Sequence, residues 1–531
     1  MEDEEGFGKK AARTLSSLLL GKFLVVLITG ATLVVVARLL GPSGYGIYTL
    51  AFGFSALVGA VGHFGIGTYF NKHLSEYSYS GNAHGISEAL SAGYLILILV
   101  AAAFTLLGIL LSGYVAAHVL QKSGISSATL VLASLSIFFS MLFGASYSGL
   151  IGLGSGKWAS ISNISEYMLQ MVVSVALVVM GFGPNGAIIG LLSGYAFGFA
   201  VAIFALYKKA SRYGKIIFMP RRTEILKALR FSLPVAGNNL LNTGTTNFAT
   251  VLLGIYATAL LLGNYGTAYR GLNLMLVVYG TIGAVLLPMF SAALAGRHSV
   301  AEIERLFERS ITYSIAIALP VIVYVIVLSK PIVYIFLTKS YGTAPLYLSV
   351  IALGAAASLI PSYLSSILIG TGNVYRVFKN NILAALAQLA SLYLLVPRFS
   401  AIGAIVSILF IGSAVQGVLF IRLVRQIFGA RMRYRRIASL FASGALLAAV
   451  IYAVTYLPYN FLQLAVGAAA VAVAYPGMLM LLGVLDRTLL EDVRRIAGRV
   501  FLFGSVVAYL SAYYNIFSKV NYPRRKRVGF P

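Results

Sequence analysis

The sequence predicts an all-α protein that crosses a membrane about fourteen times. Three observations indicate this fold class. Of the 531 residues, 59% are hydrophobic and only 10% are charged, whereas soluble domains carry about 25% charged residues. Stretches of about eighteen or more nearly uncharged residues recur along the chain, each long enough to cross a hydrocarbon core of about 30 Å as a helix. Lys and Arg collect in alternate connections between these stretches, as they do on the cytoplasmic side of membrane proteins.

The predicted spans follow one another through short connections, many of which contain Gly or Pro, such as 41–46 and 181–186. The spans are 15–37, 45–69, 88–113, 128–151, 158–181, 184–207, 231–254, 262–290, 310–329, 343–369, 376–396, 401–424, 437–457 and 461–485. The Tyr-rich stretch 500–517 is assigned to the membrane interface rather than to a further span.

With the N-terminus in the cytoplasm, most of the 40 Lys and Arg residues fall in the connections on the inner side. The most basic of these is 208–230, KKASRYGKIIFMPRRTEILKALR. We therefore expect a multi-pass protein of the cell (plasma) membrane with both termini cytoplasmic. Anionic membrane lipids explain the net charge of +26, so no nucleic-acid partner is expected.

An internal repeat predicts the domain organisation. LIGLGSGKW at 150–158 resembles LIGTGNVYR at 368–376, and LLGPSGYGIY at 39–48 resembles LLGNYGTAY at 261–269. A parallel repeat of this kind is typical of transporters that rock two halves around a central site. The predicted parts are an N-lobe of six spans (1–207), a basic cytoplasmic connection (208–230), a C-lobe of six spans (231–424), two extra spans (425–485) and a basic cytoplasmic or interfacial tail (486–531).

Metal, thiol and nucleotide chemistry find no support in the sequence. Cys is absent, and the five His residues form no HxxxH or HExxH pair. GLGSGKW at 152–158 lacks the spacing of a phosphate-binding loop. We therefore expect no cofactor, no metal and no catalytic residues, and the protein is predicted not to be an enzyme.

Charged residues inside spans are the first candidates for a transport site, because each needs a partner or a cavity. Arg270 lies within the eighth span and is predicted to line a cavity, with Asn273 one turn further on the same face. Lys22 in the first span has two open interpretations, a side chain that reaches the inner headgroups or a cation in the cavity. Glu166, deep in the fifth span, and His63 are candidates for a titratable coupling site or for structural pairing.

Amide side chains at helical spacing are candidates for binding sugars, although amides also hold membrane helices together. Asn238 and Asn242 form a polar stripe in the seventh span. Asn163 shares a helix face with Glu166, and the repeat aligns Asn163 with Asn381.

Several segments resemble the polysaccharide-biosynthesis flippases, the Wzx-like members of the multidrug/oligosaccharidyl-lipid/polysaccharide (MOP) exporter superfamily. These are ARLLGPSGYGIYTLAF (37–52), HFGIGTYFNKHLSEY (63–77), FSLPVAGNNLL (231–241), VYIFLTKSYGTAPLYLSVIALG (333–354) and the two repeated helix ends. The resemblance runs from about residue 15 to 485. Relatives often carry an acid where His63 stands, which puts any transferred acid-based coupling in doubt.

The resemblance implies the fold of the multidrug (MATE) exporters and lipid flippases, with two six-helix lobes around a cationic cavity. It also implies alternating-access transport of a glycan linked to an undecaprenyl or dolichyl carrier, in which Lys22 and Arg270 supply positive charge for the phosphate. Coupling to protons, sodium ions or the membrane potential stays open.

The sequence leaves two alternative functions. A cation-coupled multidrug antiporter of the same superfamily would resemble a twelve-helix protein with an acid in the first span, but here that span carries Lys22 and no acid. A membrane-bound glycan polymerase or transferase would need a large outer loop or an acidic catalytic motif, and the predicted outer loops are short.

Overall fold

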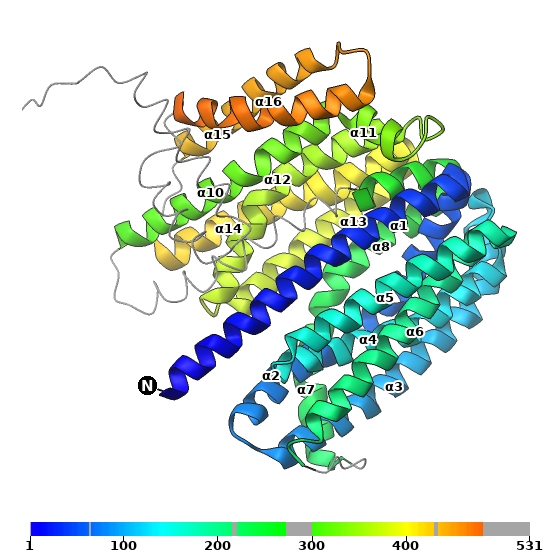
Figure 1. Ribbon diagram of the computed structural model, residues 1–531, viewed down its shortest axis with the longest axis vertical. Coiled ribbons are helices and arrows are strands. Elements are labelled where there is room, and N and C mark those ends of the chain that lie inside the picture. Colours follow the sequence, from blue (N-terminus) through cyan, green and yellow to red (C-terminus); the bar gives the residue numbers. More distant parts are fainter. Residues whose placement is uncertain (1, 63–64, 215–219, 272–299, 430–433, 482–531) are drawn as a thin grey trace, which may run out of the picture. The chain divides into compact units, whose positions relative to one another are not determined.

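A computed structural model of the chain shows a helical membrane protein (Figure 1). It describes residues 2–62, 65–214, 220–271, 300–429 and 434–481. Within these residues there is no β-strand. The chain forms two compact units, one of Met1–Val277, Phe336–Ile351 and Tyr375–Gln416, the other of Val278–Ile335, Ala352–Val374 and Gly417–Pro531. These units are defined by which residues pack together, so they do not test the lobes that the sequence repeat predicts. The lobes therefore stay a prediction.

The N-terminal helices belong to the first unit. They are α1 (Glu2–Gly62), α2 (Ile66–Tyr79), α3 (Ala83–Tyr114), α4 (Ser127–Gly152), α5 (Gly156–Leu177) and α6 (Gly183–Ala210), with short π or 3₁₀ turns η1 (Val115–Val119), η2 (Gln121–Ser123) and η3 (Val178–Phe182). In Figure 1 helices α2 to α6 form a bundle, in which α6 packs along both α4 and α5.

The rest of the described chain continues through α7 (Arg222–Asn239), η4 (Leu240–Gly244), α8 (Thr245–Tyr256) and the helical residues 259–271. After residue 300 come α10 (Val300–Val327), α11 (Ser329–Phe336), α12 (Ala344–Gly370), α13 (Val374–Ile405), η5 (Val406–Ile411), α14 (Gly412–Phe428), α15 (Tyr434–Val454) and α16 (Asn460–Leu481). In the second unit α10 packs against α15, and the Tyr475 hydroxyl of α16 donates to the Ala316 carbonyl at 2.8 Å.

Three of the predicted connections are abrupt turns within longer helical stretches. Gly41 (φ 64°) and Gly181 (φ 91°) interrupt two stretches of apolar helix, and Ser400 (φ 52°) interrupts a third. Positive φ is accessible to glycine without steric strain. Seven described helical stretches are long and apolar enough to cross a membrane, and a pair of helices joined by a bend would be an eighth. Each stretch that contains an internal break holds two of the predicted spans. The predicted fold class of about fourteen membrane helices is confirmed.

Two boundaries differ from the prediction. The second span was predicted to reach residue 69, but α1 ends at Gly62 and α2 starts after Gly65, whose φ of 66° stops a continuous helix. The outer connection after residue 329 is helical as α11, bent by 74° from α10. The break at Gly65 reflects backbone conformation, which an apolar pattern alone does not reveal.

Glycines bring helices of the first unit into backbone contact. A Cβ at Gly190 of α6 would lie 2.0 Å from the Ser174 Oγ of α5. A Cβ at Gly46 would lie 1.7 Å from the Ala259 carbonyl oxygen, and one at Gly263 would lie 1.8 Å from the Pro42 carbonyl oxygen. The last two contacts join the segment 39–48 to residues Ala259 and Gly263, at the start of the segment 261–269 that the sequence repeat relates to 39–48. Small residues at such crossings are typical of membrane helices.

We predict that Gly46→Ala and Gly263→Ala destabilise the protein, because each added methyl group meets backbone atoms that must move apart. The expected loss is about 1–3 kcal/mol, partly offset by the higher helix propensity of Ala, about 1 kcal/mol. The measurement is the thermal unfolding midpoint in detergent. Gly113→Ala in α3 is the matched control, because its nearest neighbour is 3.9 Å away; an equal effect of all three would contradict the packing argument.

Candidate functional site

A cavity of about 370 Å³ in the first unit contains Arg270. The two halves of α1, together with α5, α6 and residues 259–271, each contribute to its walls. Aromatic rings dominate the lining near the cation, and they include Tyr45, Tyr48, Phe52, Tyr167 and Tyr195. Tyr45, Tyr48 and Phe52 share one face of α1 through spacings of three and four residues.

Aromatic rings and hydroxyls hold the Arg270 side chain in place. Its Nη1 donates to the Tyr48 hydroxyl at 3.2 Å. The guanidinium carbon lies 4.9 Å from the Tyr48 ring centroid and 4.5 Å from that of Phe52, within the range of cation–π attraction. The Gln170 amide lies 3.5 Å from the same Tyr48 hydroxyl. The ion pairs of the described residues all involve other side chains, so the Arg270 charge is open to an anion.

Glu166 lies one turn from Gln170 on α5 and is almost fully buried. Neither of its carboxylate oxygens has a hydrogen-bond partner among the described residues. Its side chain packs against Gly198 of α6, where an added Cβ would lie 2.6 Å from the Glu166 Cβ. An ionised carboxylate without a partner is very costly in such surroundings. We therefore expect Glu166 to be a neutral acid in this arrangement.

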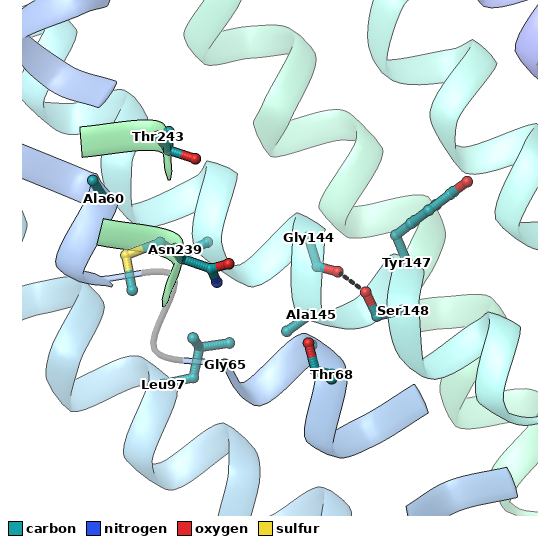
Figure 2. A pocket seen from close by; sticks show the side chains of 12 residues that line it. Ala60, Gly65, Thr68, Leu97, Gly144, Ala145, Tyr147, Ser148, Asn239 and Thr243 are labelled. Atoms are coloured by element: carbon teal, nitrogen blue, oxygen red, sulfur yellow. Dashed lines mark hydrogen bonds between the residues drawn. The ribbon is translucent and has the colours of Figure 1, made fainter. Parts of the chain in front are cut away.

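A second cavity of about 380 Å³ lies elsewhere in the first unit (Figure 2). Its lining includes Thr68 at the start of α2, Ser148 of α4, Asn239 at the end of α7 and Thr243 of η4. None of the described lining residues carries a charge. The two cavities are therefore similar in size and opposite in character, one cationic and aromatic, the other neutral and rich in hydroxyl and amide groups.

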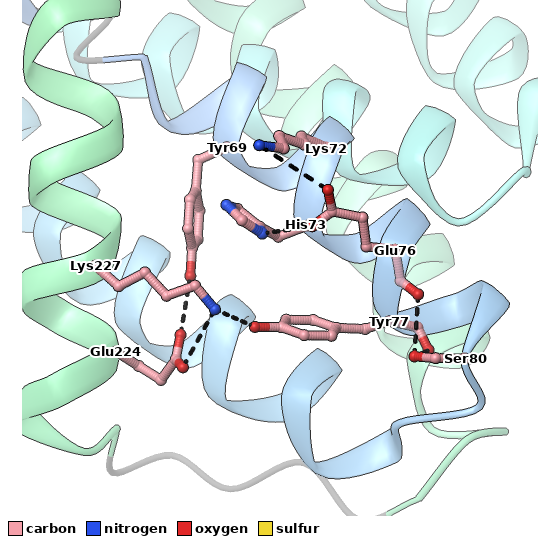
Figure 3. A network of polar contacts seen from close by, with 8 residues as sticks. All are labelled: Tyr69, Lys72, His73, Glu76, Tyr77, Ser80, Glu224 and Lys227. Atoms are coloured by element: carbon pink, nitrogen blue, oxygen red, sulfur yellow. Dashed lines mark hydrogen bonds and ion pairs between the residues drawn. The ribbon is translucent and has the colours of Figure 1, made fainter.

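A polar network fixes the end of the basic connection onto α2 (Figure 3). Lys227 donates to the Tyr77 hydroxyl and lies 3.5 Å from Glu224. The Tyr69 hydroxyl donates to Glu224 at 3.3 Å. The hydrogen bond with Tyr77 raises the pKa of the Lys227 ammonium, although burial opposes it. Residues 221–227 are thus attached to the N-terminal helices at the predicted cytoplasmic surface.

Two further charged groups extend this attachment to α3. The Nε of Arg221 lies 3.2 Å from a Glu88 carboxylate oxygen, and the Nε2 of His84 lies 3.1 Å from the same oxygen. Glu88 is itself buried. Because this buried carboxylate has two such partners, we expect it to fix the position of the start of α7 against α3.

Comparison with known proteins places the chain in a family. Residues 35–345 match the model of the family described as polysaccharide biosynthesis protein. The chain belongs to this family. No curated protein sequence matches it significantly. The resemblance to Wzx-like MOP-superfamily members that the sequence predicted is confirmed.

Solved structures support the same fold. The structure of the lipid II flippase MurJ in an inward closed conformation is similar over 87% of this chain and 98% of that chain, with a TM-score of 0.71 and 16% identity. An inward-facing multidrug resistance MATE family transporter matches over 76% and 94%, with a TM-score of 0.63 and 17% identity. An outward-facing one matches over 79% and 96%, with a TM-score of 0.56 and 17% identity. At these identities the likeness shows the fold alone.

The predicted charged residues have different surroundings. Arg270 lines the cationic cavity. Lys22 is exposed on α1 and lines neither of the two cavities. His63 lies outside the described residues.

The predicted amides are also dispersed. Asn163 is half-buried on α5 and lines neither cavity, and Asn381 accepts a hydrogen bond from Gln416 at 2.9 Å. Asn273 and the side chain of Asn242 lie outside the described residues. Asn238 lies on α7 beside Asn239, the residue that lines the neutral cavity.

The aromatic lining of the cationic cavity was not predicted. Tyr45, Tyr48 and Phe52 appeared in the sequence only as part of a family-like segment. Their common helix face was a usable signal, because a membrane arginine needs groups that stabilise its charge.

We predict that acid lowers the stability of the network around His73 of α2. Burial lowers the pKa of His73; Lys227 and Lys72 act in the same direction, and the nearby Glu76, 2.9 Å away, opposes them. The unfolded chain therefore binds the proton more readily than the folded protein, so stability falls as the pH drops below about 6.5. The rings of Tyr69 and Phe231 face the same imidazole.

The measurement is the unfolding midpoint in detergent at about pH 7.5 and pH 5.5, on either side of the ordinary histidine pKa. His73→Gln is expected to reduce the difference between the two midpoints. His118→Gln, at an exposed position, is the control for the removal of an imidazole. If the pH dependence of the midpoint survives in His73→Gln, another titratable group causes it.

Proposed function

We propose that this protein moves polyprenyl (pyro)phosphate-linked oligosaccharides across the cytoplasmic membrane by alternating access, for the assembly of cell-surface polysaccharide or protein-linked glycans. The carrier lipid would be undecaprenyl or dolichyl phosphate. The proposal rests on family membership, the transporter fold and, above all, the uncompensated Arg270 in a membrane cavity. The protein would act as a transporter and not as an enzyme, at the plasma membrane with both termini inside.

Arg270 would bind the phosphate of the carrier. A guanidinium presents several N–H donors in one plane, and it can hold two oxygens of one phosphate at once. Tyr48 uses one of these donors, and the remaining N–H groups are available to a ligand. Because the Tyr48 and Phe52 rings stabilise the cation without neutralising it, the cavity keeps a positive potential for an anionic headgroup.

The other predicted residues take secondary roles in this proposal. Lys22 would attract the headgroup toward the cavity, while anionic lipids surround the basic inner surface. The amides Asn238, Asn242, Asn273, Asn163 and Asn381 would bind sugars or hold helices. Glu166 or His63 would couple transport to protons, and sodium ions or the membrane potential are the other candidate driving forces.

An antiporter of cationic drugs is the nearest rival, and the lining of the Arg270 cavity argues against it. A cationic drug needs a carboxylate in its binding cavity, yet the only charged group among the described lining residues is a guanidinium. Glu166 lies nearby on α5 but is not part of the lining.

We predict that Arg270→Gln lowers transport of a fluorescent polyprenyl diphosphate-linked oligosaccharide in proteoliposomes by about 10- to 100-fold. This range corresponds to the roughly 1.5–3 kcal/mol of a hydrogen bond to a charged group. Arg270→Lys is expected to retain part of the activity, since the charge remains and the planar donor pair is lost. The initial rate of outward movement at matched protein density is the measurement.

Arg398→Gln is the control, because Arg398 is exposed at the end of a predicted span. It is expected to transport normally. Size-exclusion profiles of all variants establish that they remain folded. Transport by the wild type that Arg270→Gln leaves intact would remove Arg270 from the site, and absence of glycolipid movement in the wild type would remove the function itself.

We predict that Glu166→Gln keeps the protein folded and abolishes acceleration of transport by a proton gradient, while movement down the substrate gradient continues. A neutral acid and an amide have similar shape, but the amide cannot release a proton. The measurement compares transport with and without an imposed pH difference. Continued acceleration in Glu166→Gln would assign coupling to another group or ion.

A further inference from the structure

The neutral cavity contains three polar side chains that find no hydrogen-bond partner within the described structure. They are the Thr68 hydroxyl, the Asn239 amide and the Thr243 hydroxyl, which come from α2, α7 and η4. Figure 2 shows the Asn239 amide and the Thr68 hydroxyl entering from separate helices, whereas Ser148 is already bonded to the Gly144 carbonyl at 2.9 Å. These groups are exposed or half-buried and can exchange water for a ligand that replaces its hydrogen bonds, so this cavity is suited to a hydrogen-bonding ligand.

The size and openness of the cavity suit part of a larger molecule. Its volume of about 380 Å³ falls within the range of small-ligand sites, about 300–1,000 Å³. Thr68 and Thr243 are both exposed, so the cavity is accessible from outside. Gly65 and Gly67 keep space at the start of α2, since a Cβ at Gly67 would lie 3.0 Å from the Ser148 Oγ.

The chemistry of the lining selects a neutral ligand with hydroxyl groups. Amides and hydroxyls both donate and accept hydrogen bonds, which matches sugar hydroxyls that also do both. A phosphate would find no cation among the described lining residues. An apolar ligand would displace water from the Asn239 amide without replacing its hydrogen bonds, which is unfavourable.

A helix end adds donors of the same kind. Helix α2 begins at this cavity with Gly65 as its N-cap, and no side chain caps it. The first N–H groups of a helix have no partner within the helix. Those of Gly67 and Thr68 would supplement the three side chains.

We propose that this cavity is a glycan-binding subsite, separate from the phosphate-binding Arg270 cavity, in which Asn239, Thr243 and Thr68 bind hydroxyl groups of a neutral sugar. The inference rests on the proposed flippase function and adds to it a division of the cargo between two cavities. The cationic cavity would recognise the carrier phosphate, and the neutral cavity would discriminate between glycans.

The test uses Asn239→Leu and Thr243→Val, which keep side-chain size and remove hydrogen bonding. Two cargoes are compared in proteoliposomes, a polyprenyl diphosphate-linked oligosaccharide and polyprenyl phosphate without sugar. Ligand-induced rises in the unfolding midpoint report binding independently of transport. Asn71→Leu is the matched control, an exposed asparagine on α2 that lines neither of the two described cavities.

The double variant Asn239→Leu, Thr243→Val is expected to lose about tenfold or more in binding and transport of the glycan cargo and to handle the sugar-free lipid as the wild type does. Arg270→Gln is expected to impair both cargoes. Equal impairment of both cargoes by the double variant, or no impairment of either, would overturn the glycan subsite while the flippase function stands. A wild type that binds and moves neither lipid would overturn the function and the subsite together.

Discussion

The structure depends on one constraint of the bilayer, that backbone polar groups in hydrocarbon must be satisfied within the chain. Helices satisfy them, so the described residues are almost entirely helical and the connections between them are short. Gly41 and Gly181 turn the chain by adopting positive φ, and helix resumes within a few residues. Successive spans are consequently joined as hairpins, and α5 and α6 pack along each other over their length.

Close packing through glycine then decides where cavities exist. Gly190, Gly194 and Gly198 of α6 let α5 approach until side chains of α5 touch the α6 backbone. Glu166 is buried by this contact, and Gln170 and Ser174 further along α5 reach the cationic cavity. The same helix pair therefore isolates one carboxyl group and exposes two neutral polar groups to the cavity.

Arg270 shows how a permanent charge is accommodated without an acid. Its neighbours are π faces and hydroxyls, which favour the cation and leave its net charge in place. A carboxylate partner would have produced a neutral ion pair with little attraction for a ligand. The absence of an ion pair at Arg270 among the described residues therefore fits the proposed binding of a phosphate.

The sequence predicted most of the fold and part of the site. Apolar length and basic connections located the spans, because both follow from solvation. Arg270 was identified for the same reason, since a lone charge in a span stands out in sequence. The aromatic residues around it were not identified, because Tyr and Phe are common in every span and only tertiary packing selects Tyr48 and Phe52.

The polar stripe of the seventh span illustrates a subtler limit. A regular α-helical period predicted Asn238 and Asn242 as the binding face, whereas Asn239 and Thr243 line the neutral cavity. Both pairs of residues are four apart, so each pair shares a helix face. Sequence periodicity cannot choose between these two neighbouring faces, because the choice depends on how the helix packs.

In the proposed function, the two cavities together would distinguish a lipid-linked glycan from other cargoes. They have nearly equal volumes, about 370 and 380 Å³, but differ in charge and in the residues that line them. A cationic drug would be repelled by Arg270, and a simple anionic lipid would need no neutral hydroxyl-rich cavity. A glycan on a phosphate carrier has one part suited to each cavity. This correspondence favours the flippase over the antiporter through two independent features, the charge of one cavity and the neutrality of the other.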